Sequence, residues 1–294
     1  MNHCFLIIAH NNPLLLKRIV YKLQDNNHFF FIHIDKKVNI KPFIECLYGL
    51  KNIIFIENRI KVNWGGFSEI QCELLLLRTA FSAPIKMDYF HLVSGADYPC
   101  RNNKDFNEYF IKHNGESFMH YDSNIEIQMW RETKYRDRIQ KWNFIDIFPF
   151  TNKGFSLKLR RCVQRAFNIF VKREWIPNVV AGWQWFSWHR SVVEYVLKYI
   201  KLNPDYLNRY KYTSYCDEVI FHTLLQNKTN ELKINKYNSL RYIEWHPKRV
   251  YKSLPLVLKE TEYEDIIKSN SMFCRKVDTK ESHVLLSLLD DVLK

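Results

Sequence analysis

The sequence predicts an α/β fold with a mostly parallel central sheet. Short apolar runs alternate with amphipathic stretches through the first half of the chain, and this rhythm is typical of strands joined by helices. Hydrophobic residues make up 47% of the 294 residues, which is enough for one continuous buried core. Because no linker, repeat or low-complexity segment interrupts the pattern, we expect residues 1–294 to form a single domain.

The first 113 residues are expected to hold four strand–helix pairs. Pro13 and Pro42 stand where helices begin, because proline is favoured in the first helical turn, and Ser68 fits an N-cap. A turn is expected at 95–99, after the fourth strand. The strands are predicted at 4–10, 29–35, 52–56 and 88–94, and the helices at 13–25, from Pro42, at 68–82 and near 103–113.

Residues 122–175 depart from this rhythm. They are rich in charged and aromatic side chains, and residues 147–173 contain no acidic residue. We therefore expect a subregion inserted within the domain. The α/β pattern then resumes, with a strand at 183–189, helices at 190–201 and 214–227, a strand near 240–245, and helices at about 261–269 and 280–293.

Glycine scarcity excludes two classes of nucleotide-binding protein. The chain has only seven glycines, where average usage would give roughly twenty. A P-loop or a dinucleotide fingerprint needs closely spaced glycines so that backbone N–H groups approach phosphate, and no such spacing occurs here. If the protein binds phosphates, side chains must neutralise their charge.

The net charge of +13 favours anionic partners, which include nucleic acid, anionic lipid and phosphorylated small molecules. The N-terminus lacks the pattern of a signal peptide and no apolar run reaches the length of a membrane span, so the cytoplasm is the expected location. The seven cysteines include no CxxC pair. We expect reduced and mostly buried thiols.

Two acidic residues follow predicted strands. Asp35 ends one strand and Asp97 follows another after a tight turn. Ligands of open α/β sheets bind at the carboxyl ends of strands, so both residues are candidates for contacts with hydroxyl or amide groups. The alternative for each is capping of the following turn or helix. His33 shares a strand face with Asp35, but one such pair is weak support for a metal site, and a hydrogen-bonded histidine is the simpler interpretation.

The chain lacks the Asp-any-Asp element by which metal-dependent sugar-nucleotide enzymes usually hold a divalent ion. Asp217 and Glu218 are adjacent acids at the expected start of a helix, where the helix dipole favours carboxylates. Neighbours on a helix point about 100° apart, so the two do not form a shared chelate. One can cap the helix while the other faces a pocket; the alternative is that both only cap.

Cationic and aromatic residues supply the remaining candidates. The cations either remain as solvated surface or offset a diphosphate in a protein without a glycine loop. The tryptophans either stack on a base or sugar ring or belong to the core. The cations are Lys248, Arg249, Lys252, Arg275 and Lys276, and the tryptophans are Trp64, Trp183, Trp185, Trp188 and Trp245.

Six elements in one order resemble a known family. The chain is similar, from residue 4 to about 278, to the core-2/I-branching β-1,6-N-acetylglucosaminyltransferase and peptide O-xylosyltransferase family. Any one element is modest, but six in order are specific. They are Ile32-His33-Ile34-Asp35, Trp64-Gly65-Gly66-Phe67-Ser68, His91-Leu92-Val93-Ser94-Gly95-Ala96-Asp97-Tyr98-Pro99, Asp217-Glu218, Arg241-Tyr242-Ile243-Glu244-Trp245 and Phe273-Cys274-Arg275-Lys276-Val277-Asp278.

The resemblance implies a GT-A-type fold and an inverting, metal-independent transfer from a UDP-sugar to a hydroxyl group of a glycan. N-acetylglucosamine is the expected sugar, with xylose or galactose as alternatives, and no metal or other cofactor is expected. The implied roles are Asp35 for uridine, Trp64 for the base or ribose, Asp97 and Arg275 for the donor site, Lys276 for the diphosphate with Lys252 or Arg249 as a second cation, Glu218 as general base, and Trp245 and Trp185 on the acceptor side.

The resemblance is to the short bacterial members, which implies cytoplasmic synthesis of surface polysaccharide. Tyr215-Cys216 stands where better-known members have Ser-Pro. Residues 122–175 match no family element, and we expect them on the acceptor side or facing a membrane.

Residues 153–175 mix basic and apolar side chains as an interfacial segment does, so we expect peripheral contact with an anionic membrane and a lipid-linked acceptor. A basic helix packed on its own domain would have the same composition. Two further classes of protein fit the charge and the motifs, namely a nucleic-acid-binding protein and a non-catalytic member that binds a sugar nucleotide. We expect no nucleic-acid partner, because the basic residues form no recognised nucleic-acid module.

Overall fold

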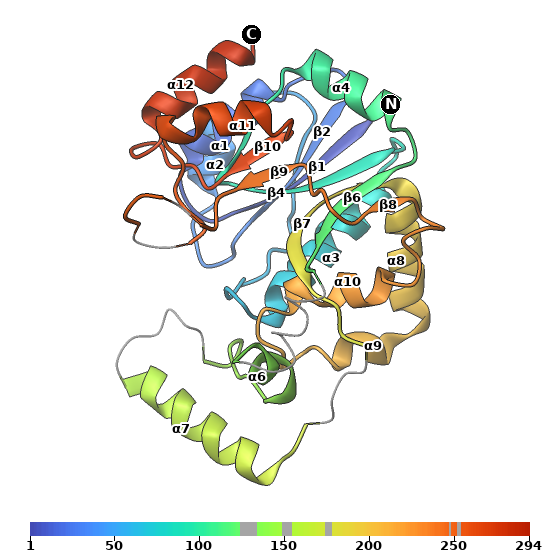
Figure 1. The fold of residues 1–294 in the computed structure, drawn as a ribbon, viewed down its shortest axis with the longest axis vertical. Helices are drawn as coiled ribbons and strands as arrows, with labels where there is room; N and C mark the ends of the chain where they lie inside the picture. The colour runs from blue at the N-terminus through green and yellow to red at the C-terminus, as the bar shows by residue number, and fades with distance from the viewer. Residues whose placement is uncertain (124–133, 149–154, 174–177, 247, 252–253) are drawn as a thin grey trace.

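The computed structural model describes residues 1–123, 134–148, 155–173, 178–246, 248–251 and 254–294 (Figure 1). Its centre is a seven-stranded sheet in the order β3-β2-β1-β4-β7-β6-β8. Strands β1 to β4 run parallel, β7 pairs antiparallel with β4 and β6, and β8 pairs parallel with β6. The strands are β1 (His3–Ala9), β2 (His28–Ile34), β3 (Ile53–Phe55), β4 (Tyr89–Ser94), β6 (Ser117–Tyr121), β7 (Gly182–His189) and β8 (Ile234–Asn235).

Alternate side chains of the buried strands face opposite layers of helices. Cys4 and Leu6 of β1 belong to one apolar cluster, and Phe5, Ile7 and Ala9 to the other, because successive side chains of a strand point to opposite faces. The first cluster lies against α3 (Phe67–Phe81), α8 (Arg190–Leu202) and α10 (Ile220–Leu225), and the second against α1 (Pro13–Lys22), α2 (Lys41–Leu47), α4 (Asn103–Lys112), α11 (Tyr263–Lys268) and α12 (His283–Val292).

A second, three-stranded sheet stands beside the first. Its order is β5 (Asp97–Pro99), β10 (Phe273–Arg275) and β9 (Arg241–Ile243). Strand β10 pairs antiparallel with β5, where Arg275 lies opposite Asp97, and parallel with β9. The small sheet therefore brings the end of the chain against the turn that follows β4.

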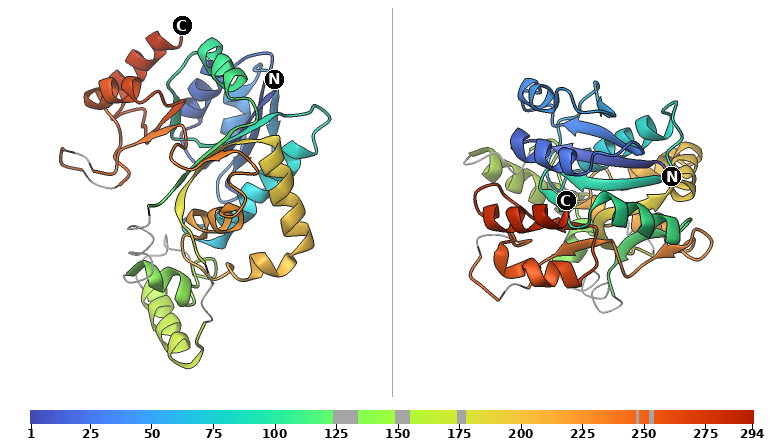
Figure 2. Two further views of the ribbon diagram at one scale, coloured as in Figure 1. Left: turned by 45° about the vertical axis from the view of Figure 1, so that its right-hand side comes forward. Right: turned by 90° about the horizontal axis from the view of Figure 1, so that it is seen from above.

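Two helices of the inserted region lie at one end of the molecule, where α6 (Lys134–Gln140) packs on the main body and α7 (Phe155–Phe170) stands farther out. They occupy the lower end of the molecule in Figure 1, and Figure 2 shows the same arrangement from another side. The short helix α9 (Pro204–Asn208) follows α8 directly in the chain and lies at its end in Figure 1. Among the described residues, no helix is both long and apolar enough to cross a membrane.

The structure corrects several details of the sequence prediction. Residues 214–227 do not form one helix: a 3₁₀ turn (Cys216–Glu218) precedes α10, and Val219 separates them. Gly66, not Ser68, is the N-cap of α3, and Ser68 lies inside the first helical turn. Strands β5, β6, β8 and β10 and helix α9 were not predicted. Of the seven cysteines, Cys46 is half-buried, Cys162 is exposed and the others are buried, and none is paired.

Candidate active site

Glu218 lies at the end of a 3₁₀ turn and is held by an arginine from the inserted region. The turn begins after Tyr215, whose φ of 54° is left-handed. Arg138 Nη1 of α6 donates to Glu218 Oε2 at 2.9 Å, and the Arg138 guanidinium stands 4.3 Å from the centre of the Tyr215 ring. The Glu218 side chain is 32% exposed. The structure therefore offers a carboxylate that is oriented by a cation and open to solvent.

The loop before α3 packs against this turn, and two glycines make the contact possible. Gly65 has φ of +70°, and its carbonyl accepts a hydrogen bond from Tyr215 N at 2.8 Å. A Cβ added to Gly65 would lie 3.1 Å from the Tyr215 ring. A Cβ on Gly66 would stand 2.5 Å from Asp146 Oδ1. Trp64 lies edge-on to Tyr215 with ring centres 5.0 Å apart and is 66% exposed. Glycine is therefore required at both positions, because a side chain would collide with Tyr215 at position 65 and with Asp146 at position 66.

Three further carboxylates stand close behind Glu218. Gly65 N donates to Glu69 Oε2 at 2.9 Å, and Gln184 Nε2 of β7 donates to Glu73 Oε1 at 2.6 Å. Glu73 Oε2 and Asp217 Oδ1 are buried and have no hydrogen-bond partner among the described residues. In a chain with a net charge of +13, four carboxyl groups are thus gathered in this part of the structure.

Burial and mutual repulsion raise the pKa values of these acids. Burial raises the pKa of Asp217 to about 6. Burial and the Asp217 carboxylate raise the pKa of Glu218 to about 8, and the Arg138 guanidinium opposes that rise. Burial also places the pKa of Glu69 well above its ordinary value. Two adjacent acids with separated pKa values are suited to different roles in proton transfer.

The cationic side of the site is built on β10. Arg275 is 11% exposed, its Nε lies 3.5 Å from Asp97 Oδ1, and its guanidinium stands 3.8 Å over the Trp185 ring. Asp97 also accepts from Ser94 N at 2.6 Å. Asp97 is 1% exposed, so its carboxylate orients Arg275. Lys276 is half-buried, and burial and Arg275 lower its pKa.

Asp35 lies at the carboxyl end of β2, as predicted, and is 6% exposed. Its Oδ1 accepts from Lys37 N at 2.8 Å, and Lys37 Nζ lies 3.4 Å from Asn63 Oδ1, next to Trp64. Asp35 and Trp64 are therefore joined through this short loop.

The other predicted residues are less integrated. Trp245 is half-buried and its indole Nε1 has no hydrogen-bond partner among the described residues. Arg249 pairs with Glu262 at 3.2 Å and donates to the Val257 carbonyl, so its guanidinium is committed to its own loop. Lys252 lies outside the described residues. Within the part of the chain that is described, no group of three or more His, Cys, Asp or Glu side chains is arranged to hold a metal ion.

Sequence reasoning missed two features of the site. Arg138 lies in the region that matches no family element, and no local signal marks it. Glu69 and Glu73 carry a usable signal, because they are acids at i and i+4 within an apolar run; that spacing places both on one side of a helix.

Comparison with known proteins identifies the family. The Core-2/I-branching enzyme family model matches residues 4–266, and the chain belongs to this family. It is 26% identical over 253 residues to xylosyltransferase 2 of Pan troglodytes, covering 83% of this chain and 26% of that protein. It is 25% identical over 293 residues to xylosyltransferase sqv-6 of Caenorhabditis briggsae, covering 91% and 34%. The chain thus spans about a quarter to a third of the length of these relatives.

The seven-stranded, mostly parallel central sheet and the helices that flank it confirm the α/β fold class expected from the sequence. A sugar-transferring enzyme is supported at the level of the family. A solved structure of 4-diphosphocytidyl-2C-methyl-D-erythritol synthase from Anaerococcus prevotii DSM 20548 has a TM-score of 0.38 and 12% identity, covering 92% of this chain and 94% of that one.

Proposed function

We propose that this chain transfers a sugar from a UDP-sugar to a hydroxyl group of a glycan, with inversion and without a metal ion. N-acetylglucosamine is the expected sugar, and xylose and galactose are the alternatives. The observation that carries the proposal is the solvent-open Glu218 carboxylate held by Arg138, in a chain that belongs to the Core-2/I-branching enzyme family.

The proposed reaction is a single displacement. Glu218 accepts the proton of the acceptor hydroxyl as its oxygen forms a bond to the anomeric carbon, and the bond from that carbon to the UDP oxygen breaks, with the electron pair leaving on UDP. Arg275 and Lys276 stabilise the negative charge that develops on the leaving diphosphate. Asp97 and Trp185 hold Arg275 in place for this task.

The proposal is tested by UDP-sugar binding and transfer measured with and without a chelator. A ligand at a hundred times its dissociation constant adds about 2.7 kcal/mol of stability, so the matching UDP-sugar should raise the melting temperature most in a panel. Transfer should persist in excess EDTA. Loss of transfer with EDTA and its recovery with Mn²⁺ would contradict metal independence, while binding without transfer would favour a non-catalytic protein.

The role of Lys276 is tested with a matched pair of variants. Lys276→Ala should weaken UDP binding and slow transfer, whereas Lys280→Ala should leave both unchanged, because Lys280 is exposed beyond β10. Equal effects of the two substitutions would remove Lys276 from the donor site.

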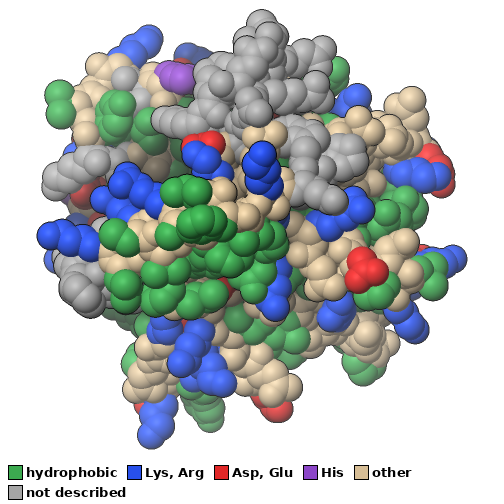
Figure 3. All heavy atoms as spheres, turned by 90° about the horizontal axis from the view of Figure 1, so that it is seen from below, with side chains coloured by type: hydrophobic (Ala, Val, Ile, Leu, Met, Phe, Trp, Pro, Cys, Tyr) green, Lys and Arg blue, Asp and Glu red, His purple; other side chains and the backbone are tan. Residues whose placement is uncertain are grey.

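We also propose that α7 contacts an anionic membrane on its cytoplasmic side, and that the acceptor is linked to a lipid in bacterial surface-polysaccharide synthesis. Helix α7 contains no acidic residue. Figure 3 shows an apolar patch on the underside of the molecule with lysine and arginine side chains around it. The exposed apolar residues are Leu159, Val163, Phe167, Ile169 and Phe170, and the exposed cations are Lys158, Arg161 and Arg165.

Two cations of the predicted membrane segment have structural partners instead. Arg160 is 6% exposed and donates to the Phe148 carbonyl at 3.1 Å. Arg173 Nη1 donates to the Ile139 and Tyr212 carbonyls at 3.0 and 3.2 Å. These two residues fasten the segment to the protein, and the other exposed cations remain available for lipid headgroups. Lys153 and Trp175 lie outside the described residues.

A further inference from the structure

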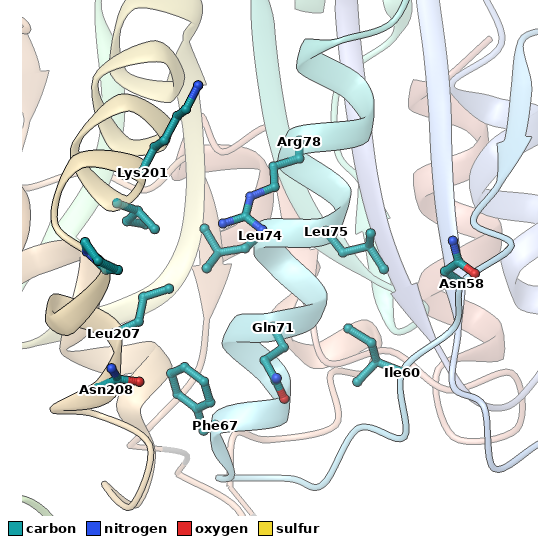
Figure 4. A pocket seen from close by; sticks show the side chains of 12 residues that line it. Asn58, Ile60, Phe67, Gln71, Leu74, Leu75, Arg78, Lys201, Leu207 and Asn208 are labelled. Carbon is teal, nitrogen blue, oxygen red and sulfur yellow. The ribbon is translucent and has the colours of Figure 1, made fainter.

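A groove of about 650 Å³ crosses α3, with Lys201, Leu207 and Asn208 on one side of the helix and Asn58 and Ile60 on the other (Figure 4). Its floor is apolar, with Leu74 and Leu75 of α3 at the centre. One end of the groove carries the two cations Arg78 and Lys201, and the other carries amide side chains. The other lining residues include the apolar Ile60, Phe67 and Leu207 and the amides Asn58, Gln71 and Asn208.

The charged side chains that line the groove are both cations. No aspartate or glutamate lines it. Arg78 and Lys201 are both exposed, and within the described residues neither side chain takes part in a hydrogen bond or an ion pair. Figure 4 shows the two side chains extending in different directions, Lys201 along α8 and Arg78 toward Leu74. Two cations that line one hollow without a lining carboxylate favour an anionic ligand.

The groove reaches the loop that precedes α3. Phe67 lines it and directly follows the Trp64–Gly66 loop that packs on Tyr215. A smaller hollow of about 340 Å³ shares Phe67 with the groove and is also lined by Asp146, whose Oδ1 accepts from Ser68 Oγ at 2.6 Å. One loop therefore separates the groove from the surroundings of Glu218.

We propose that this groove binds a carboxylate-bearing saccharide chain, as a subsite for the part of an acidic glycan acceptor that is remote from the reacting hydroxyl. This inference rests on the proposed function. The amides Asn58, Gln71 and Asn208 supply both donors and acceptors for sugar hydroxyls, and Phe67 and the leucines pack against the apolar faces of sugar rings. Arg78 and Lys201 meet the carboxylates. The groove is open along its length, which suits an extended chain.

The test measures binding of oligogalacturonate to the full chain by titration calorimetry, with a neutral malto-oligosaccharide of equal length as the control ligand. Oligogalacturonate should bind more tightly, and added salt should weaken it. The Arg78→Gln/Lys201→Gln variant should lose about tenfold in affinity, because two exposed ion pairs are removed. Gln71→Trp should also weaken binding, since its ring fills the groove without changing any charge.

Matched controls separate this site from general attraction to a basic protein. Lys17→Gln/Lys112→Gln removes two exposed cations from α1 and α4 and should bind oligogalacturonate as the unmodified chain does. Equal losses in both double variants, or binding no tighter than that of the neutral sugar, would overturn the subsite. Binding of decyl phosphate in the groove without binding of oligogalacturonate would overturn it in favour of an anionic amphiphile.

UDP binding and sugar transfer are measured on the same variants. Normal UDP affinity in Arg78→Gln/Lys201→Gln would show that the loss of oligogalacturonate affinity does not come from damage to the donor site. Oligogalacturonate binding in a protein that transfers no sugar would overturn the proposed function and leave the groove standing as a saccharide site.

Discussion

Glu218 is partly buried beside Asp217 and is also paired with a cation, and these surroundings act on its protonation in opposite directions. Burial and Asp217 favour the protonated acid, whereas Arg138 favours the carboxylate. A general base needs the carboxylate before the reaction and a proton affinity high enough to accept the hydroxyl proton during it. Arg138 favours the first condition, and burial beside Asp217 favours the second.

Glu218→Gln should lower turnover by about 10²–10⁴-fold, because removal of a positioned base costs that much. UDP affinity and melting temperature should stay close to those of the unmodified chain, because Glu218 lies outside the donor side and is one-third exposed. Measurement of all three on one variant checks this. A stable, UDP-binding Glu218→Gln protein with near-normal transfer would end the assignment.

The pH profile of transfer should depend on Arg138. The active form of a general base is unprotonated, so transfer should fall as the pH drops through the pKa of Glu218, which lies at about 8. Arg138→Gln removes the cation that opposes the raised pKa, and the acid limb of kcat/KM should move to higher pH. An unchanged limb would show that the two side chains are not coupled during catalysis. Arg165→Gln, an exposed change on α7, is the control.

The residues that sequence alone identified are those in family elements, such as Asp35 and Glu218. In the structure, Asp35 lies directly after β2 and Glu218 lies in a 3₁₀ turn. It also changes how Asp97 is understood, because burial and the contacts with Ser94 and Arg275 make it an orienting group. Arg138 had no signal, since its contact with Glu218 joins segments 80 residues apart, and no local pattern encodes such a pairing.

At the scale of elements, helix α3 has a fully buried acidic side chain, that of Glu73. Burial raises the pKa of Glu73 well above 4.5. In the unfolded chain the group titrates near its ordinary value, so the folded protein binds the extra proton. Stability is thus full below about pH 4.5 and declines as the pH rises toward the folded-state pKa.

Glu73→Gln changes the free energy of unfolding by an amount that should depend on pH. This change should be more favourable to the folded protein at pH 8 than at pH 5, by about 1–3 kcal/mol. The amide can still accept from Gln184, whose bond to Glu73 Oε1 is 2.6 Å. Urea unfolding at the two pH values measures the difference, with the exposed Glu45→Gln as control. A Glu73→Gln effect that is the same at both pH values would contradict the buried-acid interpretation.

The first half of the fold was predictable because its strands are buried on both faces and its helices have local start signals. β1, β2 and β4 are continuous apolar runs, and Pro13 begins α1 as expected. β8 has two residues and β10 three, too short for a periodic signal. Residues 214–227 have helical composition, but the left-handed Tyr215 and the packing of Gly65 against it break the helix.

At the scale of the whole molecule, the charge is distributed by function. Buried acids gather behind Glu218, whereas the exposed cations of α7 and their apolar neighbours face away from the sheet on the underside (Figure 3). A chain with a net charge of +13 is attracted to anionic surfaces over its whole extent. Only an apolar patch beside the cations adds insertion to that attraction, so the two contributions are separable by experiment.

The proposed membrane contact therefore predicts binding to anionic liposomes that weakens with salt, since each lysine or arginine near the surface contributes about 1 kcal/mol. Ile169→Ser/Phe170→Ser should lower the partition coefficient about tenfold or more, because both side chains are largely exposed, at 72% and 85%, and would lose burial in the lipid. Leu14→Ser/Ile111→Ser, which alters residues of 72% and 62% exposure on α1 and α4, should bind as the unmodified chain does. Co-sedimentation measures the partition. Equal partition onto neutral and anionic vesicles, or none, would exclude the contact and favour α7 as a basic helix of its own domain.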